Sequence, residues 1–229
     1  MFDIAPPFDQ IFTTHVGSLP RPQRLLDLLD PGAGRRVTNA EYLASELTKT
    51  VNETVSRQVA IGISIVSDGE MSKPSYATYV TERLTGFSGE FRGHAARDLL
   101  DYRDFARHQV KIGAVVPDAG GACCRGPVEL RGLGGLYEDL ARMRAAVDAS
   151  APLGAFVNSA SPGVIAVFQK NEFYPDDDSY IEAVAMAMRH EYEAIVDAGF
   201  VLQIDSPDPV SYTHLRAHET AMNISYAVY

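Results

Sequence analysis

The sequence predicts an α/β protein built on a parallel sheet, either a (β/α)8 TIM-type barrel or a doubly wound sheet. The main observation is a unit that occurs twice: an amphipathic helix, a glycine, a short apolar strand and then an acidic residue. In both copies the acid, Asp68 or Asp205, stands six residues after the glycine, Gly62 or Gly199. Apolar strands that alternate with helices are typical of buried parallel sheets. Polar residues that follow such strands collect at one edge of the sheet, where both architectures bind ligands.

The first half of the chain contains two strand candidates with a helix between them. Residues 11–16 form the first strand candidate. Thr38 and Glu41 fit a capping box that begins a helix, and one apolar face follows at four-residue spacing: Leu43, Leu47, Val51, Val55 and Val59. We expect Gly62 to end this helix and residues 63–66 to form a buried strand.

The second half repeats this order. Residues 110–116 and 154–157 are strand candidates, and residues 134–149 form a helix with Leu136, Leu140, Met143 and Val147 on one face. Ser179 is the expected cap of a helix whose apolar face comprises Ile181, Val184, Ala185, Met188, Tyr192, Ile195 and Val196. Residues 200–204 form the last strand. The polar, Arg- and Asp-rich segment 86–108 is predicted to lie outside the core, and no Gly-x-Gly-x-x-Gly motif follows a strand, which disfavours dinucleotide binding.

Composition narrows the classes of function. The chain has 229 residues, 46% of them hydrophobic, and a formal net charge of −10. Because an acidic protein repels nucleic-acid backbones, we expect no nucleic-acid partner. No apolar run has the length of a membrane span and the N-terminus lacks a signal-peptide pattern, so we expect no membrane association and a cytoplasmic location. The two cysteines, Cys123 and Cys124, are adjacent, which argues against a disulfide framework.

The end of the chain differs from the rest. Residues 210–220 resemble the in-frame translation of a transposon-end sequencing adapter, and residues 224–228 resemble the other end of the same adapter. We therefore expect residues 1–209 to be part of a barrel and residues 210–229 to be a non-native tail. On this interpretation His214 and His218, which are spaced like helical metal ligands, form no metal site.

The most specific motif is Thr13-Thr14-His15-Val16-Gly17-Ser18-Leu19-Pro20-Arg21-Pro22, in which a strand ends in a Gly-Ser turn able to hold a carboxylate. Together with Asp68-Gly69-Glu70-Met71-Ser72-Lys73-Pro74-Ser75, Ala160-Ser161-Pro162-Gly163 and Leu202-Gln203-Ile204-Asp205, it resembles the C-terminal catalytic barrel of cobalamin-independent methionine synthase. The match is closest to the short, single-barrel branch of that superfamily and covers roughly residues 11–208. The resemblance implies a (β/α)8 barrel that is truncated after about five strands.

The resemblance also implies substrate-binding residues. Val16, Gly17 and Ser18 match the turn that binds the carboxylate of homocysteine, and Glu70 and Asp205 match the acids that hold its amino group. Two acids at strand ends on one face can bind an ammonium group through charge-assisted hydrogen bonds.

Other positions have weaker assignments. His15 is a candidate for a contact to the substrate or to a sulfur-bound metal, with a structural role as the alternative. Cys124, and with it Cys123, falls near the segment that contacts the pteridine of methyl-folate, and Phe168 falls where methionine synthases place an aromatic residue against the folate. A plain buried thiol is the alternative for Cys124. The sequence around residues 123–127 departs from the family's pattern, so methyl-folate as the methyl donor is left open.

The function that the resemblance implies is a zinc-dependent methyl transfer to the thiol of homocysteine or a related small-molecule thiol, in methionine biosynthesis. The family's zinc ligands, a His-x-Cys pair, a Glu and a Cys, come from later strands. We expect none of them in this chain, which would leave it inactive and without stoichiometric zinc.

Two alternatives stay open. An epoxyalkane:coenzyme M transferase shares the zinc–thiolate chemistry, and uroporphyrinogen decarboxylases share the barrel without zinc. Coenzyme M has no ammonium group for Glu70 and Asp205 to bind, which favours an amino-acid thiol. The other alternative is a truncated product without function, because part of a barrel leaves unpaired sheet edges.

Overall fold

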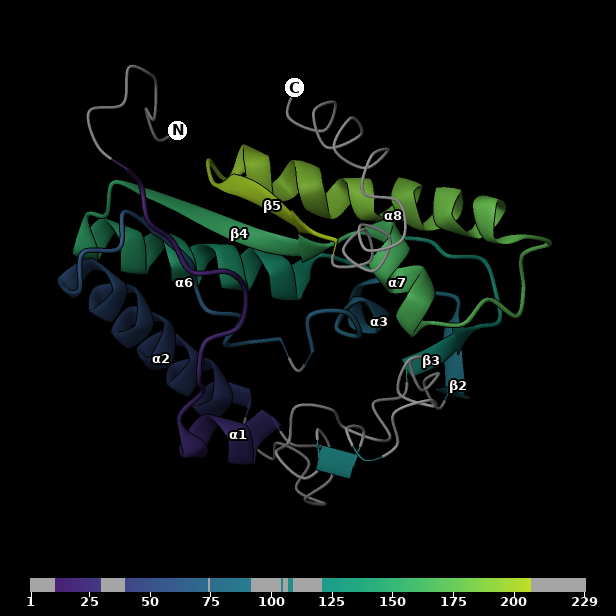
Figure 1. The fold of residues 1–229 in the computed structure, drawn as a ribbon, viewed down its shortest axis with the longest axis horizontal. Helices are drawn as coiled ribbons and strands as arrows, with labels where there is room; N and C mark the ends of the chain where they lie inside the picture. The colour runs from purple at the N-terminus through teal and green to yellow at the C-terminus, as the bar shows by residue number, and fades with distance from the viewer. Residues whose placement is uncertain are drawn as a thin grey trace.

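A computed structural model of the chain describes residues 11–29, 40–73, 75–91, 104, 107–108 and 121–206. Its helices and strands, in chain order, are α1 (Gln23–Leu29), α2 (Ala40–Ala60), β1 (Ile65–Val66), α3 (Val80–Arg83), β2 (Phe87–Phe91), β3 (Gly121–Cys124), α6 (Gly134–Ser150), β4 (Gly154–Ala160), α7 (Pro162–Phe168), α8 (Asp177–Asp197) and β5 (Val201–Asp205) (Figure 1). Helices alternate with the strands of a parallel sheet, so the predicted α/β class is confirmed.

The parallel sheet has the strand order β1-β4-β5. Ile65 pairs with Gly154, while Asn158 lies opposite Gln203 in the register between β4 and β5. At the other edge Thr14 forms a parallel bridge to Ile65, so the N-terminal segment lies beside β1. Within the described residues this sheet is small and open, and a barrel of about five strands is not confirmed.

One predicted strand stays a prediction. Residues 110–116 lie outside the described part of the chain. β4 pairs directly with β1.

The helices follow one another along the sheet in the order α2, α6, α8 (Figure 1). The predicted apolar faces of α2 and α6 are confirmed, and they form one core cluster with β1, β4 and part of α8. Its buried members include Leu47, Val51, Val55, Val66, Leu136, Leu140, Met143, Val147, Ala155, Val157 and Ile195. Gly62 and Gly199 have positive φ values of 86° and 81° just after their helices, as the sequence predicts.

The predicted start of α8 is wrong by three residues, since the expected cap was Ser179. The helix begins at Asp177 because the Asp176 carboxylate accepts a hydrogen bond from the Ser179 backbone N–H at 2.7 Å and so acts as the cap. Ile181 and Val196 are exposed rather than buried. A charged residue, Glu191, takes a buried position on the inner face.

The segment 86–108, predicted to lie outside the core, begins with β2, which pairs antiparallel with β3 so that Phe87 lies opposite Cys124. Phe87 packs against a second core cluster that contains Leu84, Cys124 and Tyr180. The prediction is therefore wrong for the start of this segment, because the Phe87 side chain packs inward.

Among the described residues, no helix combines the length and the apolar character that crossing a lipid bilayer requires.

Candidate functional site

The N-terminal motif forms a turn at the carboxyl end of the sheet. After the bridge at Thr14 the chain turns through Gly17, whose φ is +64°, and the Leu19 backbone N–H donates to the Gly69 carbonyl at 3.0 Å. The Ser18 hydroxyl donates to Glu70 Oε2 at 2.5 Å. This turn is thereby joined to the loop that follows β1.

That loop holds Glu70 in a defined position. Glu70 is only 2% exposed and has a φ of +58°, a left-handed conformation that is uncommon for a residue with a side chain. The Asp68 carboxylate accepts from the Glu70 backbone N–H at 2.9 Å, and the Arg21 guanidinium donates to the carbonyls of Glu70 and Lys73 at 2.6 and 2.5 Å. Strain of this kind persists where neighbouring contacts enforce it, and it occurs frequently at functional sites.

Gly17 lies close to this carboxylate. A Cβ atom at Gly17 would lie 3.1 Å from Glu70 Oε1, which is tighter than an ordinary contact. The glycine therefore provides both the positive φ of the turn and the room for the Glu70 carboxylate.

Asn158, on β4, brings the two predicted acids together. Its side-chain nitrogen Nδ2 donates to Glu70 Oε1 and also to Asp205 Oδ2, the latter at 2.7 Å. The second Asp205 oxygen, Oδ1, accepts from Gln203 Nε2 at 2.8 Å. Glu70 and Asp205 are thus joined through one amide nitrogen, although they stand far apart in the sequence.

The cationic side chains near this cluster donate to backbone carbonyls and not to the two carboxylates. Lys73 is 4% exposed, and its Nζ donates to the Asn158 backbone carbonyl at 2.5 Å and lies 4.7 Å from the centre of the Tyr79 ring. Arg21 binds backbone carbonyls, and burial lowers its pKa against the opposing effect of Glu70 and Asp68. The two carboxylates therefore accept hydrogen bonds from the same neutral amide, and neither has a direct cationic partner among the described side chains.

A second polar network lies on the other face of β4. The Glu191 carboxylate accepts from the Tyr79 hydroxyl at 2.6 Å and from the Ser159 hydroxyl at 2.7 Å, and its other oxygen lies 2.8 Å from Arg83 Nη1. Burial acts to raise the pKa of Glu191, but the charges of Arg83 and Lys73 outweigh it, so the pKa is lowered and the group stays ionised. This network supports the strand that carries Asn158.

The remaining predicted site residues do not join the Glu70 cluster. Val16 is 80% exposed and His15 is half-buried, and neither side chain makes a hydrogen bond to the cluster within the described residues. Cys124 is buried in β3 with its thiol 3.4 Å from the Gly126 carbonyl, and burial raises its pKa, as it does that of Cys123. Phe168, at the end of α7, packs edge-on against Tyr76 with ring centres 5.6 Å apart.

Sequence reasoning missed three groups that the structure assembles: Asn158, Lys73 as its partner, and the network around Glu191. Asn158 carried one signal, since a polar residue interrupts the apolar β4 run. The role of Glu191 had no such signal, because a glutamate on a long helix ordinarily faces solvent.

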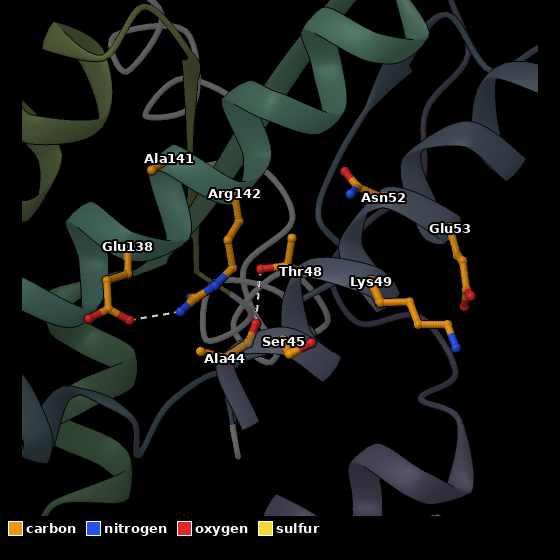
Figure 2. Close-up of a pocket in the computed structure, with 9 residues that line it drawn as sticks. All are labelled: Ala44, Ser45, Thr48, Lys49, Asn52, Glu53, Glu138, Ala141 and Arg142. Atoms are coloured by element: carbon orange, nitrogen blue, oxygen red, sulfur yellow. Dashed lines mark hydrogen bonds and ion pairs between the residues drawn. The ribbon is translucent and has the colours of Figure 1, made fainter. Parts of the chain in front are cut away.

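Two hollows border the helices near this end of the sheet. One, of about 410 Å³, is lined by α2, α6 and the loop after Glu70, including Ser72, Lys73 and Asp139. The other, of about 880 Å³, is an open groove between α2 and α6, where Figure 2 shows Arg142 paired with Glu138 opposite Thr48 and Lys49. Neither hollow is lined by Glu70 or Asp205, so the carboxylate cluster is separate from both hollows.

The described residues do not fit a metal centre. Among them, no three His, Cys, Asp or Glu side chains lie in an arrangement that could hold a metal ion. Within the described residues the adjacent buried thiols Cys123 and Cys124 belong to no such group, so we assign no step to zinc.

The sequence was compared with family models and with curated proteins. No family model matches the chain. It is 26% identical over 196 residues to a methionine synthase of Sulfolobus acidocaldarius, covering 85% of this chain and 51% of the relative. It is 24% identical over 226 residues to a 5-methyltetrahydropteroyltriglutamate–homocysteine methyltransferase of Bacillus mycoides, covering 94% of this chain and 26% of the relative. The chain thus spans about half the length of the first relative and about a quarter of the second.

Solved structures with the same fold agree. A B12-independent methionine synthase from Shewanella sp. W3-18-1, in complex with selenomethionine, aligns with a TM-score of 0.64 at 22% identity, covering 85% of this chain and 51% of that one. A structure described as a putative vitamin-B12 independent methionine synthase from Listeria monocytogenes aligns with a TM-score of 0.58 at 19% identity, covering 86% and 53%. The chain is therefore similar, at low identity and over part of their length, to B12-independent methionine synthases, which are methyltransferases of methionine synthesis.

Proposed function

We propose that this chain supplies the amino-acid-binding half of an S-methyltransferase of methionine synthesis, and that its parallel strands are the first strands of a (β/α)8 barrel. The proposal rests on one observation: the side-chain nitrogen of Asn158 donates hydrogen bonds to both Glu70 and Asp205. The substrate is homocysteine or a related amino-acid thiol.

The carboxylate pair is suited to an ammonium group. Two unit negative charges about 4 Å apart repel by on the order of 4 kcal/mol at the effective dielectric constant near a protein surface. An ammonium group between Glu70 and Asp205 converts this repulsion into attraction and donates to both acids. Asp205 is only partly buried, so this side of the pair is reachable by a small molecule.

The turn at Gly17 and Ser18 supplies the complementary half of amino-acid recognition. The Ser18 hydroxyl is committed to Glu70. The backbone N–H groups of Gly17 and Ser18, however, meet no acceptor among the described residues, so they can bind the substrate carboxylate. The proposal therefore assigns carboxylate binding to these two N–H groups and not to the hydroxyl.

Isothermal titration calorimetry on the 229-residue chain tests the proposal. L-homocysteine is compared with 4-mercaptobutyrate, which lacks the amino group, and with coenzyme M, which carries a sulfonate. Homocysteine should bind best, and Glu70→Gln or Asp205→Asn should weaken it by roughly 10- to 100-fold, since hydrogen bonds to charged groups contribute about 1.5–3 kcal/mol. Glu182→Gln, on the exposed face of α8, is the control and should leave affinity unchanged.

Other outcomes are equally informative. Equal affinity for homocysteine and 4-mercaptobutyrate would contradict an ammonium site at Glu70 and Asp205. Binding of coenzyme M alone would favour the alkyltransferase alternative.

A further inference from the structure

We propose that Asn158 is a positioning residue that holds Glu70 and Asp205 at the spacing at which both can bind a single ammonium group. This inference deepens the amino-acid site described above and rests on that proposed function. It concerns a residue that touches the two acids and acts on the substrate through them.

The hydrogen bonds of Asn158 define its action. A side-chain amide nitrogen has two N–H donors, and in Asn158 one serves Glu70 Oε1 and the other serves Asp205 Oδ2. The two carboxylates belong to different segments, the loop after β1 and the end of β5. Like charges in separate segments would move apart unless a shared donor held them.

Asn158 is itself held from the opposite side. It is 2% exposed within β4, and its backbone carbonyl accepts from Lys73 Nζ at 2.5 Å. The same ammonium lies 3.5 Å from Asn158 Oδ1. A cation on the oxygen side and two carboxylates on the nitrogen side together determine the orientation of the amide.

This geometry has a consequence for specificity. Glu70 and Asp205 retain lone pairs beyond those that Asn158 and their other partners occupy, and an ammonium group brings three donors. A thiol without an amino group brings none, so it leaves the pair without a cation. The preference for an amino-acid thiol therefore depends on the spacing that Asn158 sets.

The first arm of the test needs no ligand. Asn158→Leu, similar in size but without donors, is made in the native chain and in a Glu70→Gln/Asp205→Asn background. If Asn158 acts by separating and bonding two charges, the substitution should lower the unfolding midpoint by about 4 °C or more in the native chain. The drop should be at most half as large in the neutral background, because charge-assisted hydrogen bonds are about twice as strong as neutral ones.

Equal drops in the two backgrounds would mean that Asn158 only fills space, and would overturn the inference. Asn158→Ser, a smaller change, is measured in the same way in case the leucine variant does not fold.

The second arm uses the ratio of two dissociation constants, that of 4-mercaptobutyrate to that of L-homocysteine. Asn158→Ser should reduce this ratio about tenfold, a change of about 1.4 kcal/mol in discrimination. Asn52→Ser, at an exposed position of α2, should not change it. A residue with a purely structural role would weaken both ligands equally, so an unchanged ratio would overturn the inference. If the native chain does not distinguish the two thiols, the proposed function fails, while the unfolding comparison still decides the role of Asn158.

Discussion

Replacing Glu191 by leucine should destabilise the chain by leaving the Arg83 guanidinium buried with a poorer partner. In the native structure Arg83 Nη1 lies 2.8 Å from Glu191, and the two side chains are 9% and 2% exposed. Asp139, the other acid at Arg83, is farther away at 3.4 Å. The Glu191 carboxylate also accepts the hydroxyl hydrogen bonds of Tyr79 and Ser159, which the leucine cannot replace.

The size of the effect follows from the burial of the pair. Removing one partner of a buried ion pair costs about 3–5 kcal/mol, because the remaining charge has lost its compensation. A domain of this size loses about 2–4 °C of midpoint per kcal/mol, so the expected drop is about 6–20 °C. In Arg83→Met/Glu191→Leu both charges are removed, and much of the loss should be recovered because a buried pair contributes little net stability relative to apolar replacements.

Thermal unfolding followed by circular dichroism measures these changes. Glu193→Gln is the matched control, since Glu193 also lies on α8 but forms an exposed pair with Arg189 and should have little effect. A Glu191→Leu midpoint no lower than that of the control would refute the reasoning. A double variant that is less stable than Glu191→Leu alone would refute it as well.

Three further predictions concern pH, the N-terminal turn and metal. Burial, followed by the charge of Asp68, raises the pKa of Asp139 to about 6 from an ordinary 3.8, so the folded chain keeps a proton that the unfolded chain releases. The free energy of unfolding should therefore fall by up to about 3 kcal/mol as the pH rises from about 4 to 6 and then level off. In urea titrations at several pH values, the Asp139→Asn variant should lack this fall in the free energy of unfolding. A variant with the same pH dependence as the native chain would contradict the prediction. Gly17→Ala should weaken homocysteine binding, because the added Cβ contacts Glu70. Gly62 has a similar positive φ with open space around it, so Gly62→Ala should lower stability only. Calorimetry and thermal unfolding distinguish the two effects, and equal homocysteine affinities of the two variants would contradict the Gly17 contact. Purified chain incubated with zinc and desalted should retain well below one zinc per chain by mass spectrometry, and one tightly bound zinc would contradict this expectation.

Part of the fold could be predicted because its signals are local. The four-residue spacing in α2, the glycine after α2 and after α8, and the short apolar strand that follows each of these helices depend on neighbours in the sequence, and all three were confirmed. The start of α8 could not be predicted as well, because Asp176 and Ser179 both suit a cap and only the backbone geometry chose between them. The exposed Ile181 and the buried Glu191 were missed for a related reason: tertiary contacts overrode the apolar pattern of the helix.

The sequence by itself determined the α/β class, the long helices, and the acids placed after β1 and at the end of β5, because these features depend on periodicity and on residue types at strand ends. Only the tertiary structure decided that β4 lies between β1 and β5, and therefore that Asn158 stands between Glu70 and Asp205. The physical reason is that strand order and register are set by pairing between distant segments. The Glu70–Asn158–Asp205 cluster exists only where three such segments meet.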